Sequence, residues 1–460
     1  MFTKSEIEPL ANALRGRVIL PEDVEYDESR AVWNGMIDRR PALVARCQGT
    51  ADVMAAVNFA RENDLPVTIK AGGHNVAGRA IGDDSLVIDL SAMKGVRVEP
   101  RARSARVEAG ATWADLDREA QAFGLATTGG VDSRTGVAGL TLGGGIGYLA
   151  RRFGLTIDNL LAADVVTADG ELRRASEEEN SDLFWALRGG GGGVGVVTSF
   201  EFQLHEVGPD VLVAQIFHPL QDAEEVLRFY RDFTAGAPRE LACYAMFVHV
   251  PPVAPFPEAF HGQISLALVA CYSGSIAEGE TVLAPLKEFG DPLLNAVQPM
   301  PYTDLQQSFD AGTPDGGRYY YKSQYMNALT DAAIETIIDH VEPLPGSFSI
   351  VGIEPLGGAI GDVAEADTAF ANRDAAYNFS VWAGWDDAAD DEEIIRWARR
   401  FHEAMASHAG SGAYANYLDR DDDQRMKEAY GRNYERLLKI RKAWDPDRLF
   451  QVTGHAVQAI

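Results

Sequence analysis

A histidine follows a pair of glycines directly after the apolar run that begins at Val67. Gly72 and Gly73 carry no Cβ atom and adopt positive φ easily, so backbone N–H groups there can come close to a bound anionic group. His74 is the next residue, and its imidazole can reach a cofactor held by the same loop. The segment therefore predicts a cofactor-binding loop with His74 as its reactive group. The alternative is a plain glycine turn that carries a buried histidine.

Two further glycine clusters follow, at residues 136–147 and 189–195. A dinucleotide fingerprint of the Rossmann type requires a strand, a glycine loop and then a helix whose N-terminus faces the pyrophosphate. The second cluster does not fit this order, because residues 196–202 alternate as a strand does. We therefore expect several separate loops to supply the backbone donors for one dinucleotide.

Four motifs in order carry a resemblance to a known family. They are the Gly-Gly-His-Asn segment, residues 142–159, residues 182–191, and the C-terminal pair of Tyr414-Ala415-Asn416-Tyr417 and Tyr434-Glu435-Arg436-Leu437 with Asp445-Pro446. In these motifs the chain resembles the FAD-linked oxidases of the vanillyl-alcohol oxidase superfamily, in particular the berberine-bridge-enzyme-like branch. The resemblance spans nearly the whole chain.

The resemblance implies FAD as cofactor, with His74 as its covalent ligand at the flavin 8α carbon. Many members of this branch form a second link from a cysteine, but Asp132 occupies that position here. Since Asp132 has no thiol, only one covalent bond is expected. Besides His74, the implied cofactor-binding residues are Ala71, Gly72, Gly73, Asn75, Gly78, Asp132, Thr135, Gly136, Gly139, Gly143, Gly144, Gly145, Gly147, Gly195, Val197 and Asn416.

The resemblance also implies a catalytic base. Oxidation of an alcohol requires a group that takes the hydroxyl proton as hydride leaves the carbon, and a tyrosine can do this if its pKa is lowered. Tyr417, the last residue of the Tyr-x-Asn-Tyr motif, is our candidate for this base, and Asn416 for a flavin contact. Tyr148, just after the second glycine cluster, is a further catalytic candidate. Alternatively, the Tyr148 ring only packs beneath the cofactor and has no catalytic role.

Substrate contacts are predicted from residues 318–323, where alternation along a strand puts Tyr319 and Tyr321 on one face and Tyr320 and Lys322 on the other. One face should line the substrate pocket, and we assign Tyr319 and Tyr321 to it. Glu354 is a candidate polar substrate contact, with a solvated strand carboxylate as its alternative.

The elements that position these residues predict an α+β fold. Residues 50–60 indicate a helix opened by Thr50 as N-cap, and strands and helices alternate up to about residue 205. Longer strand-like runs separated by helices follow, which favours an antiparallel sheet covered by helices. Together with the resemblance, this predicts a PCMH-type FAD-binding domain at 1–205, an inserted substrate domain at 206–409, and a segment at 410–460 that completes the first domain.

Composition excludes several classes of function. The chain has 460 residues, 68 Asp and Glu against 41 Lys and Arg, and a formal net charge of −27, so nucleic acid and anionic membranes would be repelled. The three cysteines and the histidines lack metal-ligand spacing, and we predict no metal. No secretion signal or long apolar run is present, so we expect a cytoplasmic protein. The sequence does not specify a number of subunits.

The sequence thus predicts a covalent flavoprotein that takes hydride from a small-molecule alcohol, of a sugar or an aromatic or secondary-metabolite type. Oxygen or another acceptor would receive the electrons. An amine oxidase of the 6-hydroxynicotine-oxidase type is the first alternative, because the single covalent link and the chain length are similar. A non-catalytic flavin-binding or electron-transfer module and a nicotinamide-dependent reductase are the others.

Overall fold

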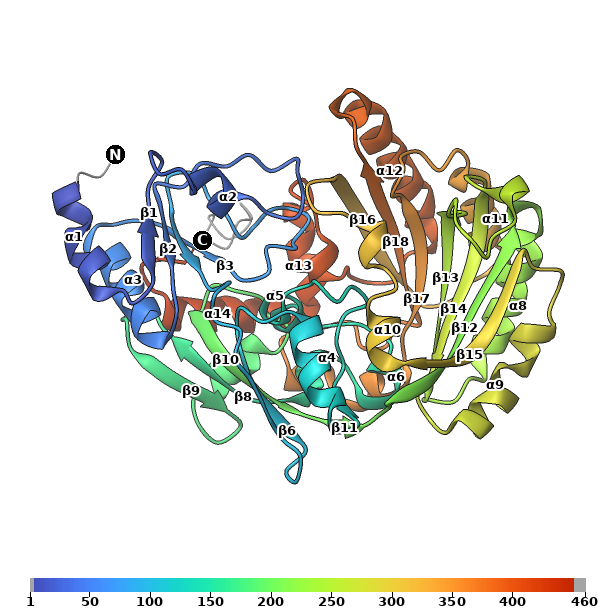
Figure 1. Ribbon diagram of the computed structural model, residues 1–460, viewed down its shortest axis with the longest axis horizontal. Coiled ribbons are helices and arrows are strands. Elements are labelled where there is room, and N and C mark those ends of the chain that lie inside the picture. Colours follow the sequence, from blue (N-terminus) through green and yellow to red (C-terminus); the bar gives the residue numbers. More distant parts are fainter. Residues whose placement is uncertain (1–3, 451–460) are drawn as a thin grey trace.

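The computed structural model describes residues 4–450, so the ends of the predicted first and third segments, 1–3 and 451–460, lie outside the described residues. The fold is α+β with four sheets. The chain forms three of them before residue 207, and the largest, of seven strands, between residues 210 and 385. Figure 1 shows the two groups of sheets side by side along the long axis.

The first group holds a small mixed sheet and a larger antiparallel one. The four-stranded sheet has the order β1-β2-β4-β3, with β2, β4 and β3 parallel, and the five-stranded sheet has the order β5-β6-β10-β8-β9. The strands are β1 (Arg17–Ile19), β2 (Leu43–Arg46), β3 (Val67–Lys70), β4 (Leu86–Asp89), β5 (Val96–Glu99), β6 (Ser104–Glu108), β8 (Leu160–Val166), β9 (Leu172–Ser176) and β10 (Val196–Gln203), and β7 (Leu125–Ala126) pairs with β11 (His205–Glu206).

The helices of this group are α1 (Lys4–Ala13), α2 (Tyr26–Arg30), α3 (Thr50–Glu62), α4 (Trp113–Gln121), α5 (Val137–Leu142), α6 (Ala150–Phe153) and α7 (Ser181–Leu187). Local chemistry explains the start of α4, where the Thr112 hydroxyl and the Asp115 carboxylate cap one another's backbone N–H groups. The predicted N-cap at Thr50 is wrong by one residue, because Gly49 is the N-cap of α3. As predicted, a strand and not a helix follows the glycines 189–195.

The second group is an antiparallel sheet with helices on one face. Its strand order is β15-β12-β14-β13-β17-β18-β16, and α8, α9, α11 and α12 lie against its outer face (Figure 1). The strands are β12 (Asp210–Pro219), β13 (Leu241–His249), β14 (Ile264–Tyr272), β15 (Leu294–Pro301), β16 (Arg318–Met326), β17 (Ile350–Pro355) and β18 (Tyr377–Trp385). The helices are α8 (Ala223–Ala235), α9 (Ile276–Glu288), α10 (Tyr302–Gln306), α11 (Asp331–Val341) and α12 (Asp391–Met405).

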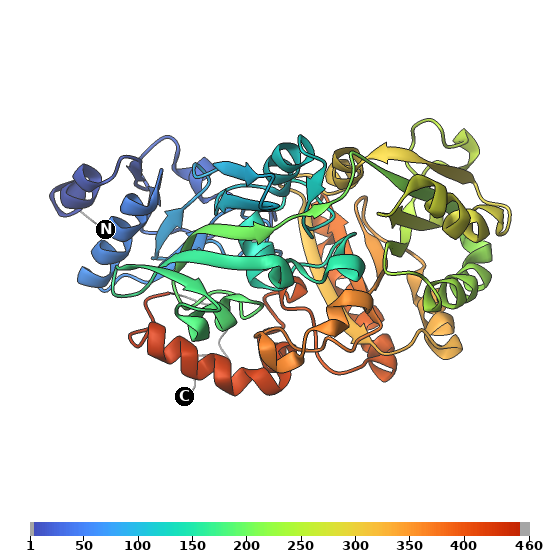
Figure 2. The same cartoon turned by 90° about the horizontal axis from the view of Figure 1, so that it is seen from below.

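The C-terminal segment returns to the first group. Two helices follow, α13 (Met426–Tyr430) and α14 (Tyr434–Trp444). Helix α14 runs along the first group of sheets (Figure 2, red), and Tyr430, Leu437 and Phe450 join the hydrophobic core of that group. Phe450 also forms a bridge to Val67 at the start of β3. The inner face of the seven-stranded sheet is thereby held against the glycine loops. None of the helices in the described range is long and apolar enough to cross a membrane.

Candidate active site

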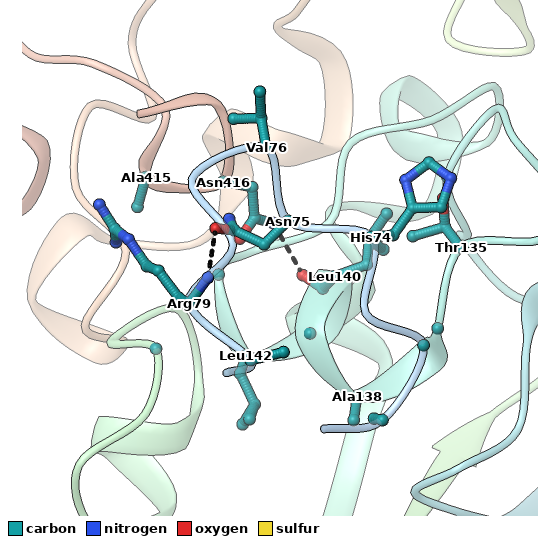
Figure 3. A pocket seen from close by; sticks show the side chains of 18 of the residues that line it. His74, Asn75, Val76, Arg79, Thr135, Ala138, Leu140, Leu142, Ala415 and Asn416 are labelled. Carbon is teal, nitrogen blue, oxygen red and sulfur yellow. Dashed lines mark hydrogen bonds between the residues drawn. The ribbon is translucent and has the colours of Figure 1, made fainter. Parts of the chain in front are cut away.

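A cavity of about 360 Å³ lies where the glycine loops, the C-terminal segment and the inner face of the seven-stranded sheet meet. The loop after β3, residues 130–143, the glycines 191–195 and residues 414–417 all contribute to its wall. Figure 3 shows His74 on the loop after β3, with Thr135 beside it. Four segments far apart in the sequence thus form one site.

Two of these loops touch through glycines. A Cβ atom on Gly72 would lie 2.6 Å from the Cα and N of Gly136, and one on Gly136 would lie 2.7 Å from the Gly72 nitrogen. Because both neighbours are backbone atoms, neither can rotate away as a side chain would. Because Gly72 and Gly136 both lack a Cβ atom, the loop that carries His74 can lie directly against the start of α5.

Replacing Gly72 by alanine should push these two loops apart. We expect the purified variant to hold clearly less flavin than wild type and to unfold at a lower temperature, since overpacking costs about 1 to 3 kcal/mol. The measurements are the flavin to protein absorbance ratio and the melting temperature. Gly236→Ala is the matched control, because a Cβ atom there meets nothing within 4 Å. Equal flavin content in the two variants would contradict the close-approach role.

His74 is held between an aromatic ring and a carboxylate. The Trp33 ring stacks on the imidazole with centroids 4.5 Å apart at 16°, and the Asp132 Oδ2 atom lies 3.7 Å from His74 Nε2. No hydrogen-bond partner of Nε2 occurs among the described residues. Burial lowers the pKa of His74 although Asp132 opposes this shift. The imidazole is therefore neutral at physiological pH.

Asp132 is fixed by two neighbours. Arg134 donates to it from its backbone N and from Nε and Nη2, the last at 2.7 Å, and the Thr313 hydroxyl donates at 2.6 Å. Burial alone would raise the pKa of Asp132, but these donors hold it below the usual range. Asp132 is thus an ionised carboxylate beside a neutral histidine.

Tyr417, which lines the cavity, meets Glu354 of β17. The Tyr417 hydroxyl donates to Glu354 Oε1 at 3.2 Å, and Asn378 Nδ2 donates to Oε2 at 2.5 Å. Glu354 is 1% exposed, and burial raises its pKa to about 7 despite these two hydrogen bonds. The prediction of a tyrosine with a lowered pKa is wrong, because burial and then the Glu354 charge raise the pKa of Tyr417 well above its usual value. The alternative of a solvated Glu354 is also wrong.

The strand register explains how these two side chains meet. Tyr321, Trp382 and Ile350 are cross-strand neighbours, all three line the cavity, and the Tyr417 ring packs edge-on against Trp382 at 5.5 Å and 82°. Glu354 lies four residues beyond Ile350 on the same face, with Gly352 between them. Gly352 has no side chain, and a Cβ atom there would come within 3.2 Å of the Ser380 hydroxyl and the Trp382 ring, so this glycine lets Trp382 lie close to β17.

The cavity collects most of the predicted cofactor residues. Of that set, the lining residues are Ala71, Gly72, Gly73, His74, Asn75, Asp132, Thr135, Gly136, Gly139, Gly143, Gly195, Val197 and Asn416. Figure 3 shows Asn416 donating to the Leu140 carbonyl, at 3.2 Å, and the Arg79 N–H donating to the Asn75 side chain, at 3.4 Å. The first bond joins the C-terminal segment to α5, and the second lies within the loop after β3.

Four of the predicted glycines, Gly78, Gly144, Gly145 and Gly147, do not line the cavity. Each one instead lies so close to a neighbouring segment that a Cβ atom would not fit. A Cβ atom on Gly78 would meet Ile37, one on Gly144 would meet Phe370, one on Gly145 would meet Thr156, and one on Gly147 would meet the Gly129 carbonyl. These glycines allow the glycine loops to pack against neighbouring segments.

Some of the predicted aromatic residues line the cavity and others do not. Tyr417 and Tyr321 line the cavity, whereas Tyr148 does not; its ring is 2% exposed and packs edge-on against Tyr244. Tyr319 shares the face of Tyr321 as predicted, yet it is buried and stacks on Trp33 with centroids 3.7 Å apart. It supports His74 from behind and does not reach the cavity wall.

Sequence reasoning missed several functional side chains. Trp382, Ile350, Phe309 and Thr313 line the cavity, and Trp33 positions His74. Strand alternation from Glu354 back to Ile350 could have indicated one of them. Trp382 lies on β18, and Trp33, Phe309 and Thr313 lie outside the strands, in segments without a motif. No group of three His, Cys, Asp or Glu side chains suited to a metal ion occurs within residues 4–450.

Comparison with known proteins gives a consistent result. The model of an FAD binding domain matches residues 41–176, and the model described as berberine and berberine like matches residues 413–454. An FAD-linked oxidoreductase of Dictyostelium discoideum is 30% identical over 450 residues, covering 97% of this chain and 95% of the relative. A xylooligosaccharide oxidase of Thermothelomyces thermophilus is 28% identical, covering 93% and 89%. The crystal structure of 6-hydroxy-D-nicotine oxidase from Arthrobacter nicotinovorans superimposes with a TM-score of 0.86 at 27% identity, covering 96% and 97%.

Proposed function

Because the chain belongs to the berberine-bridge-enzyme-like FAD-linked oxidoreductases, we propose that it oxidises a small-molecule alcohol with an FAD joined covalently to His74. The residues present fit such a cofactor. A neutral histidine lines the cavity, and glycine backbone forms much of the nearby wall. When bound, FAD supplies the acceptor for the hydride of the substrate.

The observation that carries the catalytic part of the proposal is the Tyr417–Glu354 pair. Tyr417 is protonated at neutral pH and lines the cavity, so its hydroxyl oxygen can accept a hydrogen bond from a substrate hydroxyl. As the substrate loses its proton to this oxygen, Tyr417 passes its own proton to Glu354 Oε1. Glu354 is the final proton acceptor, and the bond from Asn378 keeps it in place.

The same pair argues against a module that only binds flavin. A buried carboxylate with a pKa of about 7 costs stability and has no structural partner other than Asn378 and Tyr417 in the described contacts. Its place beside the cavity suits proton transfer.

An amine remains the second candidate substrate. Two carboxylates, Glu354 and Asp132, lie at or just behind a wall of aromatic rings, which favours a cationic or amine-bearing ligand over an anionic one. The structural similarity to 6-hydroxy-D-nicotine oxidase supports this candidate.

The experiment that tests the proposal is anaerobic mixing of the purified protein with a panel of sugars, aromatic alcohols and cyclic amines. We expect loss of the oxidised flavin absorbance with at least one alcohol and its return when air is admitted. Reduction by amines alone would select the second candidate. A flavin that dithionite reduces, but that no member of the panel reduces, would contradict the proposal.

Replacing Glu354 by glutamine should slow flavin reduction and change its pH dependence. Since the pKa of Glu354 is about 7, the wild-type rate should fall as the pH drops through that value, because protonated Glu354 accepts no further proton. We expect a loss of at least about a hundredfold in Glu354→Gln at pH 8, the lower end of the range for a lost general base, and no inflection near pH 7. Glu225→Gln, at an exposed position on α8, should keep the wild-type profile. If the rate of flavin reduction in Glu354→Gln still changed near pH 7, the group that titrates there would be a residue other than Glu354.

A further inference from the structure

We propose that Asp132 activates His74 for attachment of the flavin. This inference rests on the proposed covalent link and adds a residue that acts through the histidine. The Asp132 carboxylate lies 3.7 Å from His74 Nε2. Because Asp132 is ionised, it places a negative charge beside the imidazole.

The contacts hold both partners in one geometry. The Thr313 carbonyl accepts from Trp33 Nε1 at 2.9 Å and from Arg134 Nη2 at 2.7 Å, so a single residue ties the ring that stacks on His74 to the cation that holds Asp132. The Thr313 hydroxyl also donates to Asp132. His74 is therefore fixed on one face by Trp33 and approached by Asp132 at Nε2.

This arrangement selects the tautomer of His74. A carboxylate near Nε2 favours the form with the proton on Nε2, which leaves the lone pair on Nδ1. The distance of 3.7 Å exceeds a hydrogen bond, but such contacts often tighten only when the reacting partner is bound. Nδ1 is then the attacking atom, and Asp132 draws off the Nε2 proton as the new bond forms.

Attachment of the flavin to His74 is an oxidation, and oxygen serves as the oxidant. Joining the imidazole to the flavin methyl carbon breaks one N–H and one C–H bond and forms one C–N bond. The two electrons and two protons released reduce oxygen to hydrogen peroxide. Asp132 changes only the rate of this step, because its proton passes on to solvent.

Asp132→Asn tests the inference, since it removes the charge and keeps the shape. Full-length apoprotein from riboflavin-starved cells is mixed with saturating FAD in air, and denatured samples are followed by flavin fluorescence in gels. We expect attachment to slow at least about tenfold at saturating FAD, a concentration set for each protein from its non-covalent binding curve, measured by fluorescence quenching. Attachment at the wild-type rate would overturn the inference.

A pH profile separates activation from a merely structural role. Between pH 6 and 9 the wild-type attachment rate should be flat, because Asp132 stays ionised. In Asp132→Asn the rate should rise with pH, as hydroxide takes over the proton. A rate lowered equally at every pH would show that Asp132 only supports the loop.

Two further variants complete the test. Asp132→Glu should recover part of the rate, and Asp310→Asn should leave it unchanged, because Asp310 accepts from Ser133 and does not line the cavity. Peptide mapping of the wild type distinguishes the two proposals. A covalent flavin on His74 with a normal rate in Asp132→Asn removes the Asp132 role alone, whereas absence of any covalent flavin removes both.

Discussion

Replacing Tyr417 by phenylalanine should slow reduction of the bound flavin by about 10² to 10⁴, the usual cost of losing a general acid–base group. The variant keeps the ring that packs against Trp382 and Tyr321 and loses only the hydroxyl that reaches Glu354. Flavin content and the oxidised spectrum should therefore stay normal. The measurement is stopped-flow reduction without oxygen, using a substrate found in the panel.

The matched control is Tyr320→Phe on the opposite face of β16. Its hydroxyl donates to Asp421 and it lies away from the cavity, so reduction should remain close to wild type. A Tyr417→Phe rate within about threefold of wild type would exclude Tyr417 as the group that takes the proton. Tyr321, which lines the same wall, would be the next residue to replace.

Replacing His74 by alanine should abolish covalent attachment altogether. Among the described residues that line the cavity, His74 is the only histidine and none is a cysteine, and Asp132 cannot substitute for a cysteine. Acid precipitation should release all flavin from His74→Ala and leave it in the wild-type pellet. The readout is flavin absorbance in the supernatant.

Trp33→Leu serves as the control for indirect effects. It removes the stacked ring but keeps the imidazole, so attachment should continue at a lower rate. A yellow pellet from His74→Ala would mean that another residue carries the link.

The contiguous parts of the site could be predicted from sequence because they depend on local backbone. Gly72-Gly73-His74 forms one loop, and the motif at 414–417 delivers both Asn416 and Tyr417 to the cavity. The strand-like alternation at 318–323 correctly put Tyr319 and Tyr321 on one face. Periodicity reports only which side chains share a face and not what packs against each of them.

The missed parts depend on contacts between distant segments. Asn34 donates to the Tyr319 carbonyl and accepts from its N–H, which holds that end of β16 against Trp33 and leaves only Tyr321 at the cavity. Glu354 follows the polar pattern of a solvated strand, but it is buried and accepts hydrogen bonds from the Tyr417 hydroxyl and Asn378, neither of which adjoins it in the sequence. Glycines 144, 145 and 147 looked like a cofactor loop, but their neighbours are Phe370, Thr156 and the Gly129 carbonyl.

The most direct test of the account is a peptide mass map of the wild-type protein after denaturation and digestion. We predict that the peptide containing His74 carries the added mass and fluorescence of FAD, and that the peptide containing Asp132 is unmodified. A flavin-loaded protein whose His74 peptide has its unmodified mass would contradict the account.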